Sequence, residues 1–349
     1  VTIVSGRKIG LMQRSTMQEA VAAPKMSGIV RLTGFIIRST ILIELSGAVL
    51  LAPVFCKDFG PVRGLWMALF HSISAFCNAG IDLMGIRVPF SSLTSYAADP
   101  LINLIIMVLI ITGGIGFLTW EDIRSNQLHF SRYRMQSKVI LTTTAILILF
   151  PAIYFYFGEF RQGSLGTRIL LSLFQSVTPR TAGFNTADFS KLSESGQMLT
   201  IILMLIGGSP GSTAGGIKTT TMAVLVAAAI SVFQRNENPE LFRRRIAQET
   251  VADAAAILMM YLSLCLTGAL LISRLEQLPM MACLFETASA VGTVGLSFGI
   301  TPGLGTASRI ILIILMYLGR VGGLTLIYAA LSGHRIRFGK YPLEKITVG

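Results

Sequence analysis

Long apolar stretches recur along the 349-residue chain and are separated by short polar or charged segments. They occupy residues 29–53, 100–120, 139–157, 197–208, 251–273 and 306–331. Most are close to the roughly 20 residues that a helix needs to cross the hydrocarbon core of a bilayer. The fourth stretch is short and continues unevenly to residue 230. The pattern therefore predicts an all-α polytopic membrane protein with six crossings, the fourth of them interrupted.

Three windows between these stretches share one pattern: Leu-Phe-x-Ser/Thr, then a small residue, a glycine and an apolar residue. The windows open with Leu69-Phe70-His71-Ser72, Leu173-Phe174-Gln175-Ser176 and Leu284-Phe285-Glu286-Thr287, and their glycines are Gly80, Gly183 and Gly295. The glycines lie 103 and 112 residues apart. A period of this kind indicates an internal repeat of about a hundred residues. Chance similarity of three Ser-rich apolar windows is the competing explanation.

Each window lies between two apolar stretches, which predicts a unit of helix, short helix, glycine turn and helix. A short helix of about ten residues is about 15 Å long and crosses only half a bilayer. Non-helical backbone at that depth is tolerated only where it lines a water-filled cavity or is buried in protein. The second and third units also keep register, since Gly207 and Gly319 each lie 24 residues after the turn glycine of their unit.

The turns suit a cation. A short helix that points its C-terminal end at a pore axis presents partial negative charge there. Glycine permits the positive φ values that turn carbonyl groups inward, where they can replace the hydration shell of a K⁺ ion. Apart from the flanking Arg180, the predicted filters carry no charged side chain. The predicted backbone-carbonyl ligands are Asn78, Ala79, Gly80, Thr181, Ala182, Gly183, Thr293, Val294 and Gly295.

A second candidate element is the glycine-rich segment 207–218, which interrupts the fourth apolar stretch. Glycine and proline at this density disrupt a helix. We interpret the segment as a gate below the filter, whereas a kinked helix packed through its glycines is the structural alternative. The predicted gate residues are Gly207, Gly208, Ser209, Gly211, Gly215, Gly216, Lys218 and Arg320.

Arg320 is a charge inside the last apolar stretch, and such a residue usually faces an aqueous cavity or a partner. We expect it to form an electrostatic barrier below the filter and to contact the 207–218 loop. The alternative is an arginine at a helix end that extends to the membrane interface.

Composition agrees with a membrane protein, since 52% of the residues are apolar, 13% are charged and the mean hydropathy is +0.68. The net charge of +12 does not indicate nucleic-acid binding, because 18 of the 29 Lys and Arg gather in the stretches 7–38, 124–138, 235–245 and 335–345. Such stretches are expected in the cytoplasm. The protein should therefore be a multi-pass protein of the cell membrane, embedded in the lipid bilayer, with cytoplasmic basic linkers and C-terminus.

No enzyme class is supported. The four cysteines and three histidines lack metal-site spacing. A phosphate-binding loop needs Gly-Lys-Ser/Thr in sequence, whereas this chain has Gly216-Ile217-Lys218-Thr219. An intramembrane serine protease would need a histidine inside a clear span. We expect neither catalytic residues, nor an organic cofactor, nor a metal site beyond K⁺.

Three segments resemble the filters of the second, third and fourth repeats of the Trk/Ktr/HKT potassium transporter superfamily. They are Cys77–Ile81, Arg180–Thr186 and Gly292–Leu296. In length and in its tail the chain is most similar to the KtrB membrane subunit. The resemblance implies four repeats around one pseudo-fourfold pore, and this chain is expected to lack the first.

On this interpretation the chain has four parts. Residues 1–28 are the end of the first repeat and a cytoplasmic linker, 29–135 the second repeat, 136–245 the third with a broken inner helix, and 246–349 the fourth with a short tail.

The resemblance implies potassium uptake down the electrochemical gradient, in which Na⁺ could act as a modulating or symported ion. It also implies a homodimer and a cytosolic KtrA- or TrkA-like nucleotide-binding ring on the basic face. The alternatives are a broken-helix secondary transporter of a small solute and, since a quarter of the filter would be absent, a non-conducting fragment.

Overall fold

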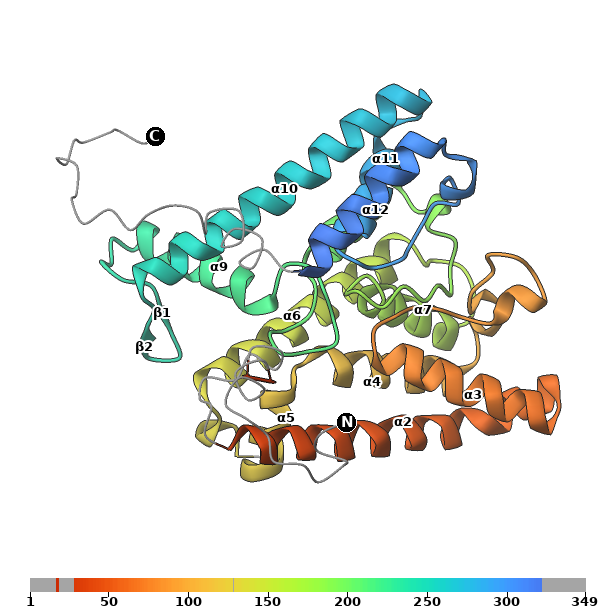
Figure 1. Cartoon of the computed structure of the whole chain (residues 1–349), viewed down its shortest axis with the longest axis horizontal. Helices are drawn as coiled ribbons and strands as arrows, with labels where there is room; N and C mark the ends of the chain where they lie inside the picture. The colour runs from red at the N-terminus through yellow and green to blue at the C-terminus, as the bar shows by residue number, and fades with distance from the viewer. Residues whose placement is uncertain (1–16, 19–27, 128, 322–349) are drawn as a thin grey trace.

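The computed structural model describes residues 17–18, 28–127 and 129–321 (Figure 1). The expected remnant of a first repeat in residues 1–10, the basic stretch 335–345 and the tail 340–345 lie outside the described residues. The described part is mostly helical, as the sequence predicted.

Three long helices and a series of shorter ones make up the fold. The α-helices are α2 (Ile29–Phe59), α3 (Pro61–Phe76), α4 (Pro100–Gly114), α5 (Phe117–Asn126), α6 (Met135–Gly158), α7 (Leu165–Val177), α8 (Glu194–Leu205), α9 (Thr219–Phe233), α10 (Gln248–Glu276), α11 (Met280–Val291) and α12 (Thr306–Val321). Single 3-10 turns occupy Met84–Ile86, Thr94–Tyr96, Phe130–Arg132, Phe189–Lys191 and Thr301–Gly303, and β1 (Glu240–Leu241) pairs with β2 (Arg244–Arg245) in an antiparallel hairpin.

Each long helix packs against the short helix that follows it: α2 on α3, α6 on α7 and α10 on α11. In the first pair, shown at the bottom of Figure 1, a Cβ on Gly64 would lie 2.4 Å from Cα of Cys56, so a glycine is needed where the two helices cross. The short helices have 16, 13 and 12 residues, longer than the expected ten. The longest, α3, begins directly after the turn at Gly60 instead of after a loop. The long helices begin next to the expected unit boundaries at 29, 136 and 246, but the division into units stays a prediction.

The long helices are apolar and yet little covered by protein. In the most apolar window of α2 only 22% of the residues are buried, and in α6 and α10 only 33%. Large side chains such as Leu42, Leu45 and Val49 on α2 are more than half exposed. A water-soluble protein rarely leaves a continuous apolar surface of this size uncovered. The surface is instead suited to lipid, as expected for a membrane protein.

The apolar stretch 100–120 is not the straight crossing that the sequence predicted. The helix bends by 99° between α4 and α5. The bend occurs at Gly116, which has φ of 86°, a value that disfavours other residues. The indole of Trp120 donates to the carbonyl of Thr112 at 2.9 Å, across the bend.

The stretch 197–230 is interrupted, as expected. Helix α8 ends at Leu205 and α9 begins at Thr219. The residues flanking the interruption meet again, since Ile206 and Ile217 form a parallel bridge and the Gly207 amide donates to the Ile217 carbonyl at 2.8 Å. The intervening chain is therefore a loop that leaves the span and returns to almost the same point.

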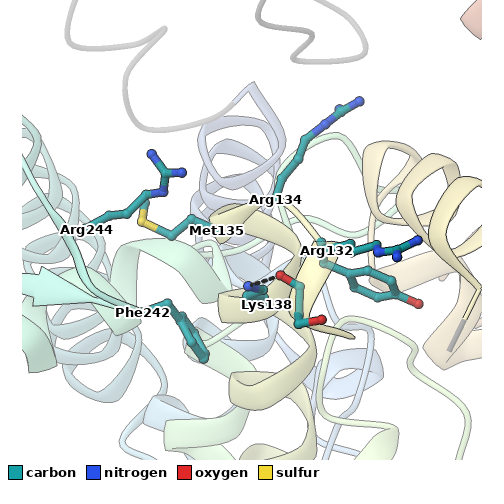
Figure 2. Close-up of a pocket in the computed structure, with 8 residues that line it drawn as sticks. Arg132, Arg134, Met135, Lys138, Phe242 and Arg244 are labelled. Atoms are coloured by element: carbon teal, nitrogen blue, oxygen red, sulfur yellow. Dashed lines mark hydrogen bonds between the residues drawn. The ribbon is translucent and has the colours of Figure 1, made fainter. Parts of the chain in front are cut away.

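Two of the basic stretches lie side by side. Residues 131–135 and Lys138 line a cavity of about 490 Å³ together with Phe242 and Arg244 of the hairpin. Figure 2 shows Arg132, Arg134, Lys138 and Arg244 around this cavity. The linkers 124–138 and 235–245 thus share one face, which is what a common cytoplasmic side requires.

Candidate functional site: three glycine turns and the loop beneath them

The three predicted filter segments have the same backbone conformation. Gly80, Gly183 and Gly295 have φ of 66°, 81° and 91°. The residues two positions earlier, Asn78, Thr181 and Thr293, also have positive φ, at 49°, 62° and 53°. Positive φ is rare for residues other than glycine and strained for threonine. The same unusual alternation in three separate segments indicates a common structural demand on all three.

The structure brings the three turns together. A Cβ added to Gly80 would lie 2.2 Å from the carbonyl oxygen of Ala182 and 2.7 Å from Cα of Gly183. A Cβ added to Gly183 would lie 2.3 Å from the carbonyl oxygen of Val294. The turns are thus in backbone contact, although they lie about a hundred residues apart in sequence. Only glycine allows so close an approach.

Each turn follows the C-terminal end of a short helix and is held by a hydroxyl group near that end. The hydroxyl of Ser74 donates to the Ile81 carbonyl at 2.7 Å, and that of Thr178 to the Phe184 carbonyl. In the third turn the Ser289 hydroxyl instead accepts from the Gly295 amide at 3.1 Å. Helices α3, α7 and α11 therefore direct the negative ends of their dipoles to one region, which favours a cation there.

Two side chains of the turns have no hydrogen-bond partner within the described residues. The hydroxyls of Thr181 and Thr293 are buried and unpaired. Asn78 holds the same position in the first turn, and its amide instead lies 3.4 Å from the Arg180 carbonyl and 3.2 Å from the Thr213 hydroxyl. Buried hydroxyls are normally paired. The two threonine hydroxyls are therefore exceptions among the described buried polar groups, and both lie at the same position of their turns.

The loop 206–218 folds back under these turns. The Gly208 amide donates to Gly215, and the Thr219 amide donates to Gly208. The Lys218 ammonium donates to the Ala214 carbonyl at 2.7 Å, from within the same loop. These bonds hold the loop in a compact conformation between α8 and α9.

Two parts of the loop touch the predicted filters. The Thr213 hydroxyl lies within 3.2 Å of the Phe76 carbonyl, the Asn78 side chain and the Gly113 carbonyl. A Cβ on Gly215 would lie 2.1 Å from the Thr293 hydroxyl, and a Cβ on Gly216 would lie 3.4 Å from the Gly292 carbonyl. The loop therefore contacts both the first and the third turn.

The predicted gate residues do not all face the turns. Gly207, Gly208, Gly215 and Gly216 lie where the loop closes. The Gly211 carbonyl accepts from Phe117 at the bend between α4 and α5, and the Ser209 hydroxyl contacts that of Thr219. Gly211 and Ser209 therefore join the loop to the starts of α5 and α9.

Arg320 reaches the loop, as the sequence led us to expect. Its guanidinium donates to the Thr213 carbonyl at 3.0 Å from the end of α12. It also lines a cavity of about 1660 Å³ that includes Gly80, Gly183 and Gly295. The contact is present, while a role in gating stays a prediction.

Two contacts were missed from the sequence. Thr213 was not among the predicted gate residues, although its hydroxyl makes three contacts with the first turn and its neighbours. Glu44, a charge inside the first apolar stretch, had no expected partner, and the thiol of Cys77 lies 3.8 Å from its carboxylate. For Glu44 the available signal was a single charge inside an apolar run. Thr213 is one of several small polar residues in its loop and gave no such signal.

The cavity extends to loops beyond the turns, where Asp188 and Lys191 lie on its border. The Ser190 hydroxyl donates to the Asp188 carboxylate at 2.6 Å, and Lys191 lies 3.3 Å away. The pKa of the Asp188 carboxyl lies below its ordinary value, and the main cause is the hydrogen bond from the Ser190 hydroxyl. A negative charge therefore persists near this mouth at neutral pH. Within the described residues, no group of three or more His, Cys, Asp or Glu could hold a metal ion.

The family and the relatives that this chain resembles are all named as cation or potassium transport proteins. Residues 3–334 match the TrkH family, described as cation transport protein. The chain is 37% identical to the potassium/sodium uptake protein NtpJ of Enterococcus hirae, over 99% of this chain and 78% of that protein. It is also 37% identical to the Ktr system potassium uptake protein B of Bacillus subtilis, over 100% of this chain and 78% of that protein.

The fold has a solved counterpart. The crystal structure of the potassium transporter TrkH from Vibrio parahaemolyticus superposes with a TM-score of 0.71 at 18% identity, covering 90% of this chain and 69% of that one. At this identity the likeness concerns the fold alone.

Proposed function

This chain belongs to the TrkH family of cation transport proteins, and from this premise we propose that it takes up K⁺ across the cell membrane through the three glycine turns. The observation that carries the proposal is the backbone contact of Gly80 with Ala182 and of Gly183 with Val294. Turns that meet in this way can direct their carbonyl groups at a single ion and replace its hydration shell. The proposed ligands are the carbonyls of residues 78–80, 181–183 and 293–295.

The proposed pore has pseudo-fourfold symmetry, and residues 29–135, 136–245 and 246–349 each supply one quadrant of it. The dipoles of α3, α7 and α11 favour a cation at the turns. Transport is passive, down the electrochemical gradient of K⁺. Na⁺ is the proposed modulating or symported ion, which the name of the Enterococcus hirae relative, potassium/sodium uptake protein, supports. Membership of this family does not favour the broken-helix secondary transporter.

The loop 206–218 is the proposed gate. Its contacts with the first and third turns through Thr213 and Gly215 support this role, because a loop in this position obstructs the path below the turns. Arg320 is the proposed electrostatic barrier, since its guanidinium both lines the cavity and bonds to the loop. A loop bonded by backbone groups to several helices can move when those helices move.

The proposed partners are a cytosolic nucleotide-binding ring of KtrA or TrkA type and a second copy of the chain. The relative from Bacillus subtilis is named as part of a Ktr system. The basic face formed by Arg132, Lys138 and Arg244 supports docking of an acidic partner surface there (Figure 2).

The proposal is tested by ⁸⁶Rb⁺ uptake in cells that lack their own potassium uptake, comparing Gly183→Ala with Gly163→Ala. Both glycines have positive φ, at 81° and 101°, so both variants strain the backbone. Only at Gly183 would the new Cβ meet a backbone oxygen, since Gly163 has nothing within 4 Å. We expect uptake to be lost in Gly183→Ala and kept in Gly163→Ala. Equal uptake by the two variants, at equal amounts in the membrane, would falsify the proposal.

A further inference from the structure

The repeated motif Leu-Phe-x-Ser/Thr leaves its third position undefined, and this position holds His71, Gln175 and Glu286. All three are polar and lie inside the protein: His71 and Gln175 are fully buried and Glu286 is only 5% exposed. Burying a polar side chain is costly unless it is hydrogen-bonded. A polar residue at the same buried position of three short helices therefore points to a common bonding partner.

Glu286 has the most extensive contacts of the three. One carboxylate oxygen accepts from the Phe298 amide at 3.0 Å and from the Ser297 hydroxyl at 2.6 Å. The other accepts from the Thr301 hydroxyl at 2.7 Å. Both oxygens are thus directed at the chain that follows the third glycine turn.

The other two side chains make the corresponding contact with single bonds. The amide of Gln175 donates to the Thr186 hydroxyl at 3.0 Å. The His71 ring accepts from the Leu83 amide at 3.3 Å through Nε2. Its other nitrogen lies 2.7 Å from the Met67 carbonyl and so carries the proton, which leaves Nε2 as the acceptor.

The three partners occupy one register position. Leu83, Thr186 and Phe298 each lie three residues after the turn glycine of their unit, Gly80, Gly183 and Gly295. Three different side chains, each with different hydrogen-bonding chemistry, thus reach the same point of the repeat. The three units therefore share the place of this contact, three residues after the turn glycine, although the side chains that make it differ.

We infer that His71, Gln175 and Glu286 are positioning residues that hold the outer end of each glycine turn and thereby set the spacing of its carbonyl oxygens. The inference rests on the proposed function, and it adds residues that determine ion selectivity. Each turn is fixed at its inner end by the short helix and at its outer end by this bond. The segment between them, residues 78–80, 181–183 or 293–295, has little freedom to adapt to an ion of another size.

The effect of each positioning residue on ion selectivity should grow with the number of its hydrogen bonds and with the charge of its side chain. Hydrogen bonds to an ionised carboxylate are about twice as strong as those between neutral groups. Glu286, with three bonds, should therefore matter more than Gln175 or His71, with one each to the post-turn segment.

The test compares Glu286→Gln with Thr287→Val in uptake of K⁺ and Na⁺ by cells expressing the chain. Among the described residues, the Thr287 hydroxyl bonds only to carbonyls of its own helix, at 2.9 and 3.2 Å, and to the Cys265 thiol. The Thr287→Val variant therefore removes a buried polar group of α11 without touching the post-turn segment. Glutamine fills the space of Glu286 but cannot accept all three bonds. We expect Glu286→Gln to lower the K⁺-over-Na⁺ ratio about tenfold, and Thr287→Val to leave it within about twofold.

A second pair keeps the inference testable should Glu286→Gln fail to reach the membrane. Gln175→Leu removes the bond to Thr186, whereas the control Ser176→Ala removes a bond to the Leu173 carbonyl of the same helix. We expect a fall of about threefold in the K⁺-over-Na⁺ ratio for the first and none for the second.

The outcomes separate the two claims. A loss of total uptake with an unchanged ion ratio in both pairs would overturn the inference, because a merely structural role lowers the amount of active protein without changing selectivity. Absence of K⁺ uptake by the unaltered chain would overturn the proposed function, and the inference with it.

Discussion

The outer and inner halves of the proposed pore differ in how closely the three units agree. At the glycine turns they repeat one backbone: positive φ at the glycine and again two residues earlier, in all three. Below the turns they diverge. Helix α4 bends by 99° into α5, α8 and α9 are separated by the loop 206–218, and α12 is described as one helix to Val321 (Figure 1).

On the proposed function, the difference reflects two physical tasks. Coordinating an ion requires oxygens at the same distance on all sides, so each turn has the same conformation. Obstructing the path requires only one segment, which a single unit can supply. The loop of the second unit (residues 136–245) is accordingly bonded to the first turn through Thr213 and lies against the third turn through Gly215. The shared conformation of the three turns and the differences between the segments beneath them can therefore be tested by separate substitutions.

The largest effect is expected from Gly80→Ala. Its Cβ would lie 2.2 Å from the Ala182 oxygen, and moving that backbone should cost about 3 kcal/mol, or about a hundredfold in uptake. Gly295→Ala would meet only Cα of Gly183, at 3.9 Å, among the described residues, and should lose about fivefold through its positive φ alone. Rates of ⁸⁶Rb⁺ uptake measure both. Equal losses of uptake would mean that the positive φ, and not the close backbone contact, requires glycine at residues 80 and 295.

The second largest effect is expected in the inner half of the proposed pore, where the three units differ. Arg320→Gln removes a positive charge from the cavity below the turns, and two like charges about 10 Å apart repel by about 1–2 kcal/mol at an effective dielectric constant of about 20. We expect K⁺ flux to rise about tenfold. Arg320→Lys keeps the charge and replaces only the guanidinium, whose one bond among the described residues is to the Thr213 carbonyl, so it should stay near the original flux. A rise of equal size in both variants would assign the effect to the contact instead of the charge.

A smaller rise is expected from Thr213→Val. The hydroxyl that is lost lies within 3.2 Å of Phe76, Asn78 and Gly113, and a hydrogen bond of this kind contributes about 1 kcal/mol. The loop should leave its closed position more often, which raises flux about fivefold. Ser212→Ala is the control, because the Ser212 hydroxyl bonds to Ser209 and Ala214 within the loop. An unchanged flux in Thr213→Val would show that the loop is not held by the first turn.

The smallest effect is expected at the outer mouth, from Asp188→Asn. Loss of this charge should raise the KM for K⁺ about twofold at low ionic strength and less in high salt. Because the folded-state pKa of Asp188 lies below its ordinary value of 3.8, the charge is present above that value and is lost only as the pH falls through the lower one. The effect of the substitution should therefore be constant from pH 5 to pH 8, as uptake at several pH values will show. A difference that fades between pH 8 and pH 5 would contradict this assignment.

Much of the fold follows from the sequence, because apolar length and the repeated Leu-Phe-x-Ser/Thr pattern are local properties. The short helices, the turns at Gly80, Gly183 and Gly295 and the break after residue 205 are of this kind. The bend at Gly116 was not predicted, since the apolar run continues through it and the contact of Phe117 with the loop at Gly211, which favours the new direction, is not visible in the sequence.

The contacts that bring the site together could not be predicted from the sequence. Thr213 is one of several small polar residues in its loop, and only the distances to Phe76, Asn78 and Gly113 set it apart. The same holds for Glu286, whose partners lie 11 to 15 residues further along the chain. Such partners are chosen by tertiary packing, to which local sequence is only weakly related.

The most direct measurement is the position of bound Rb⁺ by anomalous diffraction from crystals of the protein grown in a rubidium salt. Ion density in contact with the carbonyl oxygens of residues 78–80, 181–183 and 293–295 at once is the predicted result. Density confined to other parts of the cavity, with the three glycine turns free of ions, would contradict a pore built from these turns.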